Sequence, residues 1–205
     1  MNTRWGTRLL WLALLTGAGT ACAKDTGTSL SKLKIDPART AVVGLSSGAY
    51  MATQAQLAYP ELFPNAALVA GGPYGCAGGK LEVALGSCMK GVPAPDVPAL
   101  VASASKRSAA GEIGALKNLA RAHVYLLHGK DDALVAPAVA EAGARFYEQL
   151  RDDTPGLKGM QVHDDGQRAF AHNLPVAASG DDCDKSVSPY LGHCGFDAAG
   201  EIFAQ

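Results

Sequence analysis

Apolar residues in this chain gather in short runs that alternate with longer alanine-rich or amphipathic stretches. The runs are rich in Val, Ala and Leu and are bounded by glycine or polar residues, a pattern that predicts buried strands. They lie at residues 39–46, 65–77, 122–132 and 159–166. A weaker run at residues 31–37 ends at a proline and predicts a short edge strand.

The stretches between these runs favour helices. Residues 47–63 are rich in Ala and Gln, and residues 99–120 predict helix in pieces. Residues 137–153 begin with a proline, which suits the first turn of a helix. One apolar stripe along that stretch comprises Val139, Gly143, Phe146 and Leu150. Strands that alternate with helices predict the α/β class, with a mostly parallel sheet flanked by helices.

Two regions carry weaker signals. Residues 78–98 contain three prolines and predict irregular structure. Residues 188–205 are typical of a loop that leads into a helix.

The first residues predict an exported protein. An arginine-bearing start, an apolar run and the small residues Ala21-Cys22-Ala23 are typical of a signal peptide with cleavage after Ala23. The apolar run is too short to span a bilayer, so no transmembrane segment is predicted. We therefore expect a signal peptide at 1–23, one catalytic domain at 24–205, and an extracellular or periplasmic protein. In the alternative interpretation, Cys22 carries the lipid of a lipoprotein.

Composition narrows the possible partners. The 205 residues are 48% hydrophobic and 18% charged, with a formal net charge of −1. A chain of this kind folds around a core, and it carries no charge excess that would attract nucleic acid. We expect that the protein binds no nucleic acid and no cofactor. We also expect it to be a monomer.

Four cysteines remain after export, an even number that suggests two disulfides in an oxidising compartment. Each pair of neighbouring cysteines encloses a short loop rich in Gly, Pro or Ser. Among the three possible connectivities we favour Cys76–Cys88 and Cys183–Cys194, the alternative being four buried thiols. No spacing matches a zinc site, and no metal is predicted.

The stretch "VVGLSSGAYM" carries the chemistry. A strand, then Gly-x-Ser-x-Gly, then a helix is the pattern of a nucleophile elbow. Gly44 and Gly48 would relieve crowding in the tight turn, and Ser46 would project above the end of the strand. The N–H of Ser47, at the start of the helix, could donate to a developing oxyanion. A plain Gly/Ser turn is the alternative.

A serine nucleophile needs a base and an acid that orients the base, and in this class they follow the serine in the order acid, then histidine. Asp132 lies in the loop after the strongest strand and is the preferred acid, with Asp131 as its alternative. His172 follows the last strand by a loop and is the preferred base, with His163 as the competitor. We interpret His128 as a packed, hydrogen-bonded residue of its strand.

The elbow comes unusually early. An ordinary α/β-hydrolase has several strands before it and a loop there that supplies a second oxyanion donor. Here only residues 24–45 precede the bend, enough for one or two short strands. A circularly permuted order would resolve this, and the cysteine-containing segment 183–196 is the candidate for the missing strand and donor.

Several motifs together resemble the secreted short-chain poly(3-hydroxybutyrate) depolymerases, a circularly permuted α/β-hydrolase branch. They are "GLSSGAYMATQ", "VAGGPYGCA" followed by "GSCM", "HGKDDALV", "AHNLP" and "SPYLGHCGFDAAG", and they occur in family order. The resemblance implies hydrolysis of polyhydroxyalkanoate esters through an acyl-enzyme.

The resemblance also implies a role for individual residues. Ser46 would be the nucleophile, Asp132 the orienting acid and His172 the base. The backbone N–H groups of Ser47 and Cys194 would hold the oxyanion, and the disulfide of Cys194 would fix its segment.

The chain stops at "FDAAGEIFAQ", where related enzymes are longer, so we expect a fragment or a minimal version. Two other functions stay open: an esterase for soluble short-chain or plant-wall esters, and an inactive exported binding protein with the hydrolase fold.

Overall fold

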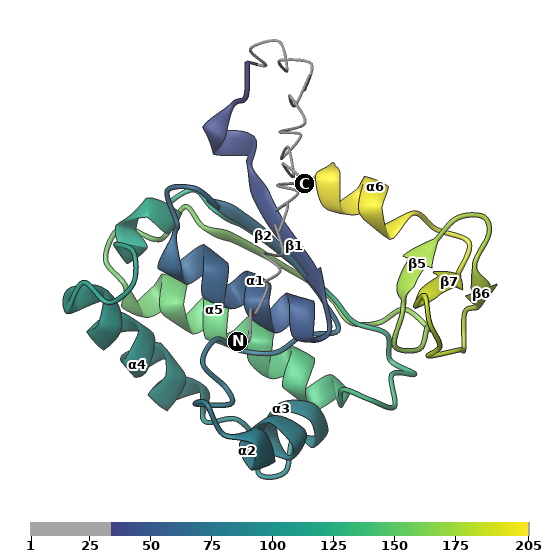
Figure 1. The fold of residues 1–205 in the computed structure, drawn as a ribbon. Coiled ribbons are helices and arrows are strands. Elements are labelled where there is room, and N and C mark those ends of the chain that lie inside the picture. The colour runs from purple at the N-terminus through teal and green to yellow at the C-terminus, as the bar shows by residue number, and fades with distance from the viewer. Residues whose placement is uncertain (1–33, 205) are drawn as a thin grey trace, which may run out of the picture. The chain divides into compact units, whose positions relative to one another are not determined.

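A four-stranded parallel sheet forms the centre of the fold (Figure 1). The strands lie side by side in chain order, and every pairing is parallel. They are β1 (Ala41–Leu45), β2 (Asn65–Val69), β3 (His123–Leu127) and β4 (Gln161–Asp165). Each falls within a run that the sequence predicted as strand. The structure, a computed structural model, describes residues 34–204, so the predicted signal peptide and Cys22 lie outside the described residues.

Three long helices cover one face of this sheet (Figure 1). They are α1 (Ser47–Ala58), α4 (Val97–Ala109) and α5 (Pro137–Asp153). The side chain of Asp96 accepts a hydrogen bond from the Ala99 N–H and caps α4. Pro137 stands in the first turn of α5, as the sequence predicted.

Alternate residues of β2 and β3 face opposite sides of the sheet, which gives two cores. On the α1–α4–α5 side, Ala66, Leu68, Val124 and Leu126 pack against buried residues such as Phe146, Tyr147 and Leu150. On the other side, Ala67, Val69, Tyr125 and Leu127 pack against Phe170 and against Ala198 and Ile202 of α6 (Ala198–Phe203). The two central strands, β2 and β3, are therefore covered on both faces, as the α/β pattern predicts.

β1 is less buried than the sequence predicted. It pairs with β2 alone among the described strands and occupies the edge of the sheet. Its central residue, Val43, is 43% exposed, so the β-branched run marks an edge strand rather than a buried one. The predicted strand at 31–37 is absent from its described part, where the short 3-10 helix η1 (Pro37–Arg39) follows Asp36 instead.

The region predicted as irregular contains two short helices, α2 (Leu81–Leu85) and α3 (Ser87–Lys90). The disulfide Cys76–Cys88 ties α3 to the glycine-rich loop after β2. After α4, the predicted helical pieces continue only as the 3-10 helix η2 (Leu116–Leu119). Among residues 34–204 no helix has the length and apolarity needed to cross a membrane.

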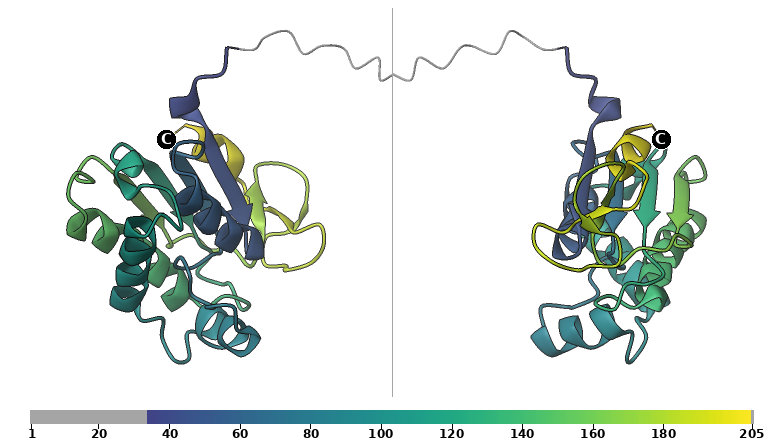
Figure 2. Two further views of the ribbon diagram at one scale, coloured as in Figure 1. Left: turned by 60° about the vertical axis from the view of Figure 1, so that its left-hand side comes forward. Right: turned by 90° about the vertical axis from the view of Figure 1, so that its right-hand side faces the viewer.

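A second, smaller sheet follows β4. It consists of β5 (Leu174–Val176), β6 (Asp181–Asp182) and β7 (Leu191–His193), and β7 lies between the other two. The disulfide Cys183–Cys194 closes this segment, so both disulfides have the pairing that the sequence favoured. Residues 183–196 do supply a strand, but β7 joins the small sheet rather than the main one. Figure 2 shows the loops of this segment beside the carboxyl end of β1 in both views.

Candidate active site

A sharp bend connects β1 to α1 at Ser46. Ser46 has φ 57° and ψ −121°, a conformation that a residue with a side chain rarely adopts and that costs about 1–3 kcal/mol. Its N–H donates to the Val69 carbonyl at 2.8 Å, and its carbonyl accepts from the Ala49 N–H at 2.9 Å. The end of the neighbouring strand and the first turn of α1 therefore hold the bend, and α1 begins at the next residue, Ser47.

Only one of the two glycines in the motif occupies a position where a side chain would clash with neighbouring atoms. A Cβ atom on Gly44 would lie 2.1 Å from the Gly48 carbonyl oxygen, whereas a Cβ on Gly48 would meet nothing within 4 Å. The expectation that both glycines relieve a clash is therefore wrong for Gly48. Gly44 lets the first turn of α1 approach the strand that precedes it.

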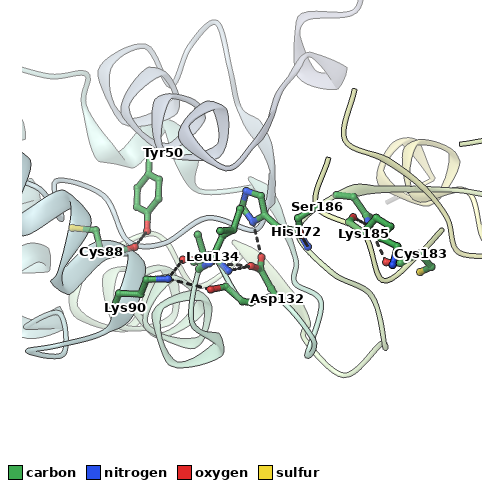
Figure 3. Close-up of polar contacts among 12 residues, drawn as sticks. Tyr50, Cys88, Lys90, Asp132, Leu134, His172, Cys183, Lys185 and Ser186 are labelled. Carbon is green, nitrogen blue, oxygen red and sulfur yellow. Dashed lines mark hydrogen bonds and ion pairs between the residues drawn. The ribbon is translucent and has the colours of Figure 1, made fainter. Parts of the chain in front are cut away.

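Asp132 lies in the turn after β3 and is held from two sides. Its Oδ1 accepts hydrogen bonds from the Leu134 N–H at 2.8 Å and the Val135 N–H at 2.9 Å. Its Oδ2 lies 2.7 Å from Nδ1 of His172 (Figure 3). Burial by itself would raise the pKa of Asp132, but these hydrogen bonds outweigh it and hold the pKa below its ordinary value. The neighbouring Asp131 is exposed.

His172 is buried, and its ring is oriented by Asp132. Its backbone N–H donates to the Ser186 hydroxyl at 3.1 Å, which anchors the residue to the segment before β7. Because Nδ1 faces the carboxylate, Nδ1 carries the proton in the neutral ring and Nε2 is left as the acceptor.

Ser46 and His172 line one cavity of about 330 Å³, together with Leu45, Ser47, Leu134 and Tyr190. The structure has no hydrogen bond between the Ser46 hydroxyl and the His172 ring among the described residues. In free enzymes this contact is often long and shortens when substrate binds. The three predicted side chains are therefore close together, with His172 between Ser46 and Asp132.

Neither of the other two histidines considered in the sequence forms a hydrogen bond with Asp132 among the described residues. His163 stacks on Tyr125 with ring centroids 5.1 Å apart, and Asp132 contacts His172 instead. His128 follows β3 by one residue and is packed, but its ring nitrogens have no hydrogen-bond partner among the described residues. The expected packing of His128 is therefore confirmed, whereas its hydrogen bond stays a prediction. Burial lowers the pKa of this ring.

The two predicted oxyanion donors differ in their surroundings. Ser47 is the first residue of α1, where backbone N–H groups lack partners within the helix. The N–H of Cys194 donates to the Val176 carbonyl at 3.1 Å. In this structure the Cys194 N–H therefore extends the hydrogen bonding of the small sheet and does not lie free for an oxyanion, contrary to the expectation.

A second and larger cavity, of about 620 Å³, also reaches Ser46 and Ser47. Its volume lies within the range of small-molecule sites. The glycine-rich loop after β2 forms part of its wall, including Tyr74. Within residues 34–204 no group of three or more acidic, His or Cys side chains could hold a metal ion.

Three residues of the site escaped sequence reasoning. The Asn173 side chain donates to the carbonyls of Cys183 and Lys185 and so fixes the chain beside His172. The ring of Tyr190 is perpendicular to the ring of His172, and the two ring centroids are 6.4 Å apart. Tyr50 of α1 donates to the Cys88 carbonyl and joins the elbow helix to α3 (Figure 3). No spacing or periodicity in the sequence marks these contacts, which depend on tertiary packing.

The parallel sheet, the strained serine and the buried Asp132–His172 pair define an α/β-hydrolase with the Ser–His–Asp arrangement of serine hydrolases. No family model matches the chain. In sequence it is 34% identical to a poly(3-hydroxybutyrate) depolymerase of Delftia acidovorans over 92% of the chain. It is 31% identical to a polyhydroxybutyrate depolymerase of Talaromyces funiculosus over 94% of the chain.

Solved structures give the same relationship. A serine-to-alanine variant of a PHB depolymerase complexed with an R3HB trimer matches 83% of the chain, with a TM-score of 0.68 and 27% identity. The PHB depolymerase from Penicillium funiculosum matches 82%, with a TM-score of 0.66 and 28% identity. The chain is a relative of the poly(3-hydroxybutyrate) depolymerases, which confirms the family predicted from its motifs.

The match covers only part of these relatives. The chain spans 36% of the Delftia protein and 53% of the Talaromyces protein. It spans 53% and 50% of the two solved chains.

The two glycines of the elbow give a matched pair of variants. Gly44→Ala should lower the free energy of unfolding by about 2 kcal/mol or more, because its Cβ would overlap the Gly48 carbonyl. Gly48→Ala should stay within about 1 kcal/mol of wild type, because its Cβ enters open space in a helix. Urea denaturation of both variants measures the difference, and equal losses would contradict the close approach at Gly44.

Asp132 should make stability depend on acid pH. Because its pKa in the folded state is lowered, its contribution to stability is complete above the unfolded value of about 3.9 and is lost as pH falls through the folded pKa. Asp132→Asn should flatten this part of the curve of unfolding free energy against pH. Asp131→Asn, which removes the exposed neighbour, is the control. A wild-type slope retained in Asp132→Asn would refute the assignment.

Proposed function

We propose that this chain hydrolyses esters of short-chain hydroxyalkanoates, with poly(3-hydroxybutyrate) as the foremost substrate, through an acyl-enzyme on Ser46. The observation that carries the proposal is the buried hydrogen bond that His172 donates to Asp132, beside a cavity that both His172 and Ser46 line. Support for the substrate class comes from the relatives, whose names give poly(3-hydroxybutyrate) or polyhydroxybutyrate as what they depolymerise.

In the proposed reaction, Nε2 of His172 takes the proton of the Ser46 hydroxyl, and the serine oxygen bonds to the ester carbonyl carbon. When the tetrahedral intermediate collapses, the bond from that carbon to the alcohol oxygen breaks, and His172 gives its proton to the departing alcohol. Water then attacks the acyl-enzyme with His172 as base, which releases the acid and restores the serine. Asp132 stays ionised and stabilises the imidazolium that forms in each step.

The Ser47 N–H is the proposed oxyanion donor, since it stands at the start of α1 directly after the nucleophile. One such donor is worth about 3–4 kcal/mol of barrier lowering. Cys194 would act as the second donor only after its N–H left the Val176 carbonyl, which a bound substrate would have to induce.

We also propose that the protein works outside the cytoplasm. The two disulfides are of the kind that persists in oxidising compartments, and the predicted signal peptide precedes the described residues.

Three variants test the proposed roles. Ser46→Ala and His172→Ala should each lower kcat for p-nitrophenyl butyrate by about 10⁴-fold or more, because the nucleophile and its base act as a unit. His163→Ala is the matched control: this exposed ring stacks on Tyr125 away from Asp132, so its removal should leave turnover near wild type. Loss of activity in His163→Ala together with full activity in His172→Ala would reverse the assignment.

Polymer and soluble esters separate the proposed substrate from the alternative of a general esterase. The wild-type protein should clear a suspension of poly(3-hydroxybutyrate) and release hydroxyacid, measured by turbidity and chromatography. Turnover of p-nitrophenyl butyrate without clearing would instead identify an esterase for soluble esters. Absence of both, with no labelling of Ser46 by a fluorophosphonate, would identify a binding protein.

A further inference from the structure

Ser46 lines two cavities. The two cavities differ in whether His172 also lines them. The smaller one is lined by Ser46, Ser47 and His172. The larger one, of about 620 Å³, is lined by Ser46 and Ser47 but not by His172. A bound ester has an acyl side and an alcohol side, so the two cavities offer a place for each.

The position of His172 assigns the two sides. The alcohol oxygen must receive its proton from His172, so the alcohol leaves through the cavity that His172 lines. The acyl carbon stays on the Ser46 oxygen until water arrives. Its chain therefore extends into the cavity that touches Ser46 but not His172.

The wall of the larger cavity is mostly apolar, with Met51, Met89, Ala84 and Val135 among its lining side chains. Arg107 of α4 is the one charged side chain that lines it among the described residues. A lone guanidinium in an apolar wall is a specific donor, because it offers five N–H groups in a planar fork and cannot lose its charge.

Arg107 is held in place by two neighbours. Its Nη1 donates to the Tyr74 hydroxyl at 2.5 Å, and its Nε pairs with Glu112 at 3.1 Å. The Tyr74 ring is buried in the core, so this end of the contact is fixed. Since the Tyr74 oxygen accepts from Arg107, its own O–H proton is available to donate, and Nη2 of Arg107 has no partner among the described residues. Both donors belong to side chains that line the cavity.

We propose that the larger cavity takes the acyl chain of the substrate, and that Arg107 and Tyr74 donate hydrogen bonds to an oxygen in that chain. The preferred acyl group is then one with an internal ester, such as the 3-acyloxyacyl unit of a hydroxyalkanoate oligomer, rather than a plain alkanoyl chain of equal length. This inference rests on the proposed function. It adds that the larger cavity binds the acyl side of the ester and the smaller cavity binds the alcohol side.

Isomeric esters test the side of binding. Methyl octanoate has its long chain on the acyl side, and heptyl acetate has it on the alcohol side. Ala84→Phe, which fills the larger cavity, should lower kcat/KM for methyl octanoate at least about tenfold more than for heptyl acetate. An equal loss for the two esters, or a greater loss for heptyl acetate, would overturn the assignment.

A matched pair of variants on α4 tests the donor. The readout is the ratio of kcat/KM for the p-nitrophenyl ester of the 3-hydroxybutyrate dimer to that for p-nitrophenyl octanoate. Arg107→Gln should lower this ratio roughly tenfold, the loss expected for a hydrogen bond from a charged donor. Lys106→Gln removes one positive charge from an exposed neighbour that does not line the cavity, and should leave the ratio at its wild-type value.

A second variant guards against a folding defect in Arg107→Gln. Tyr74→Phe keeps the buried ring, removes the hydroxyl and should also lower the ratio. Unchanged ratios in both variants would overturn the inference. Turnover of p-nitrophenyl acetate, whose acyl chain is too short to use the cavity, reports the Ser46 chemistry alone. If the wild-type protein turns over p-nitrophenyl acetate but both variants keep the wild-type ratio, only this inference is refuted. If the wild-type protein does not turn over p-nitrophenyl acetate, the proposed function is refuted as well.

Discussion

The arrangement depends on one buried hydrogen bond, the 2.7 Å contact between Oδ2 of Asp132 and Nδ1 of His172. It joins the turn after β3 to the segment that leads into the small sheet, two parts of the chain that share no strand pairing. Two backbone N–H groups hold the other oxygen of Asp132, so the carboxylate has little freedom to turn away. The histidine ring is thereby fixed with Nε2 available to the serine.

The serine is held by a second constraint that acts on the backbone. Positive φ at Ser46 is unfavourable, and the end of β2 and the first turn of α1 compensate through hydrogen bonds. Each disulfide then ties down a loop near the site: Cys76–Cys88 beside the larger cavity and Cys183–Cys194 behind His172. Cross-links of this kind stabilise a fold mainly by restricting the conformations of the unfolded chain.

The sequence predicted the local elements, the disulfide pairing and the Asp132–His172 pair, but it missed several features that tertiary contacts set. The four main strands, α5 and the elbow follow from apolar runs, a proline and the glycine–serine motif around Ser46, all of which act within a few residues. The edge position of β1 and the surroundings of the Cys194 N–H depend on which segments become neighbours. The same holds for Asn173 and Tyr190, whose contacts with the His172 region join residues from different loops.

The most direct test of the central claim is the rate at which a fluorophosphonate modifies the protein, with the modified residue mapped by mass spectrometry. The account predicts one adduct, on Ser46, that forms rapidly in the wild-type protein and at least about a hundredfold more slowly when His172 is replaced by Ala, since the imidazole removes the serine proton. An adduct on another residue, or an equal rate without the imidazole, would contradict it.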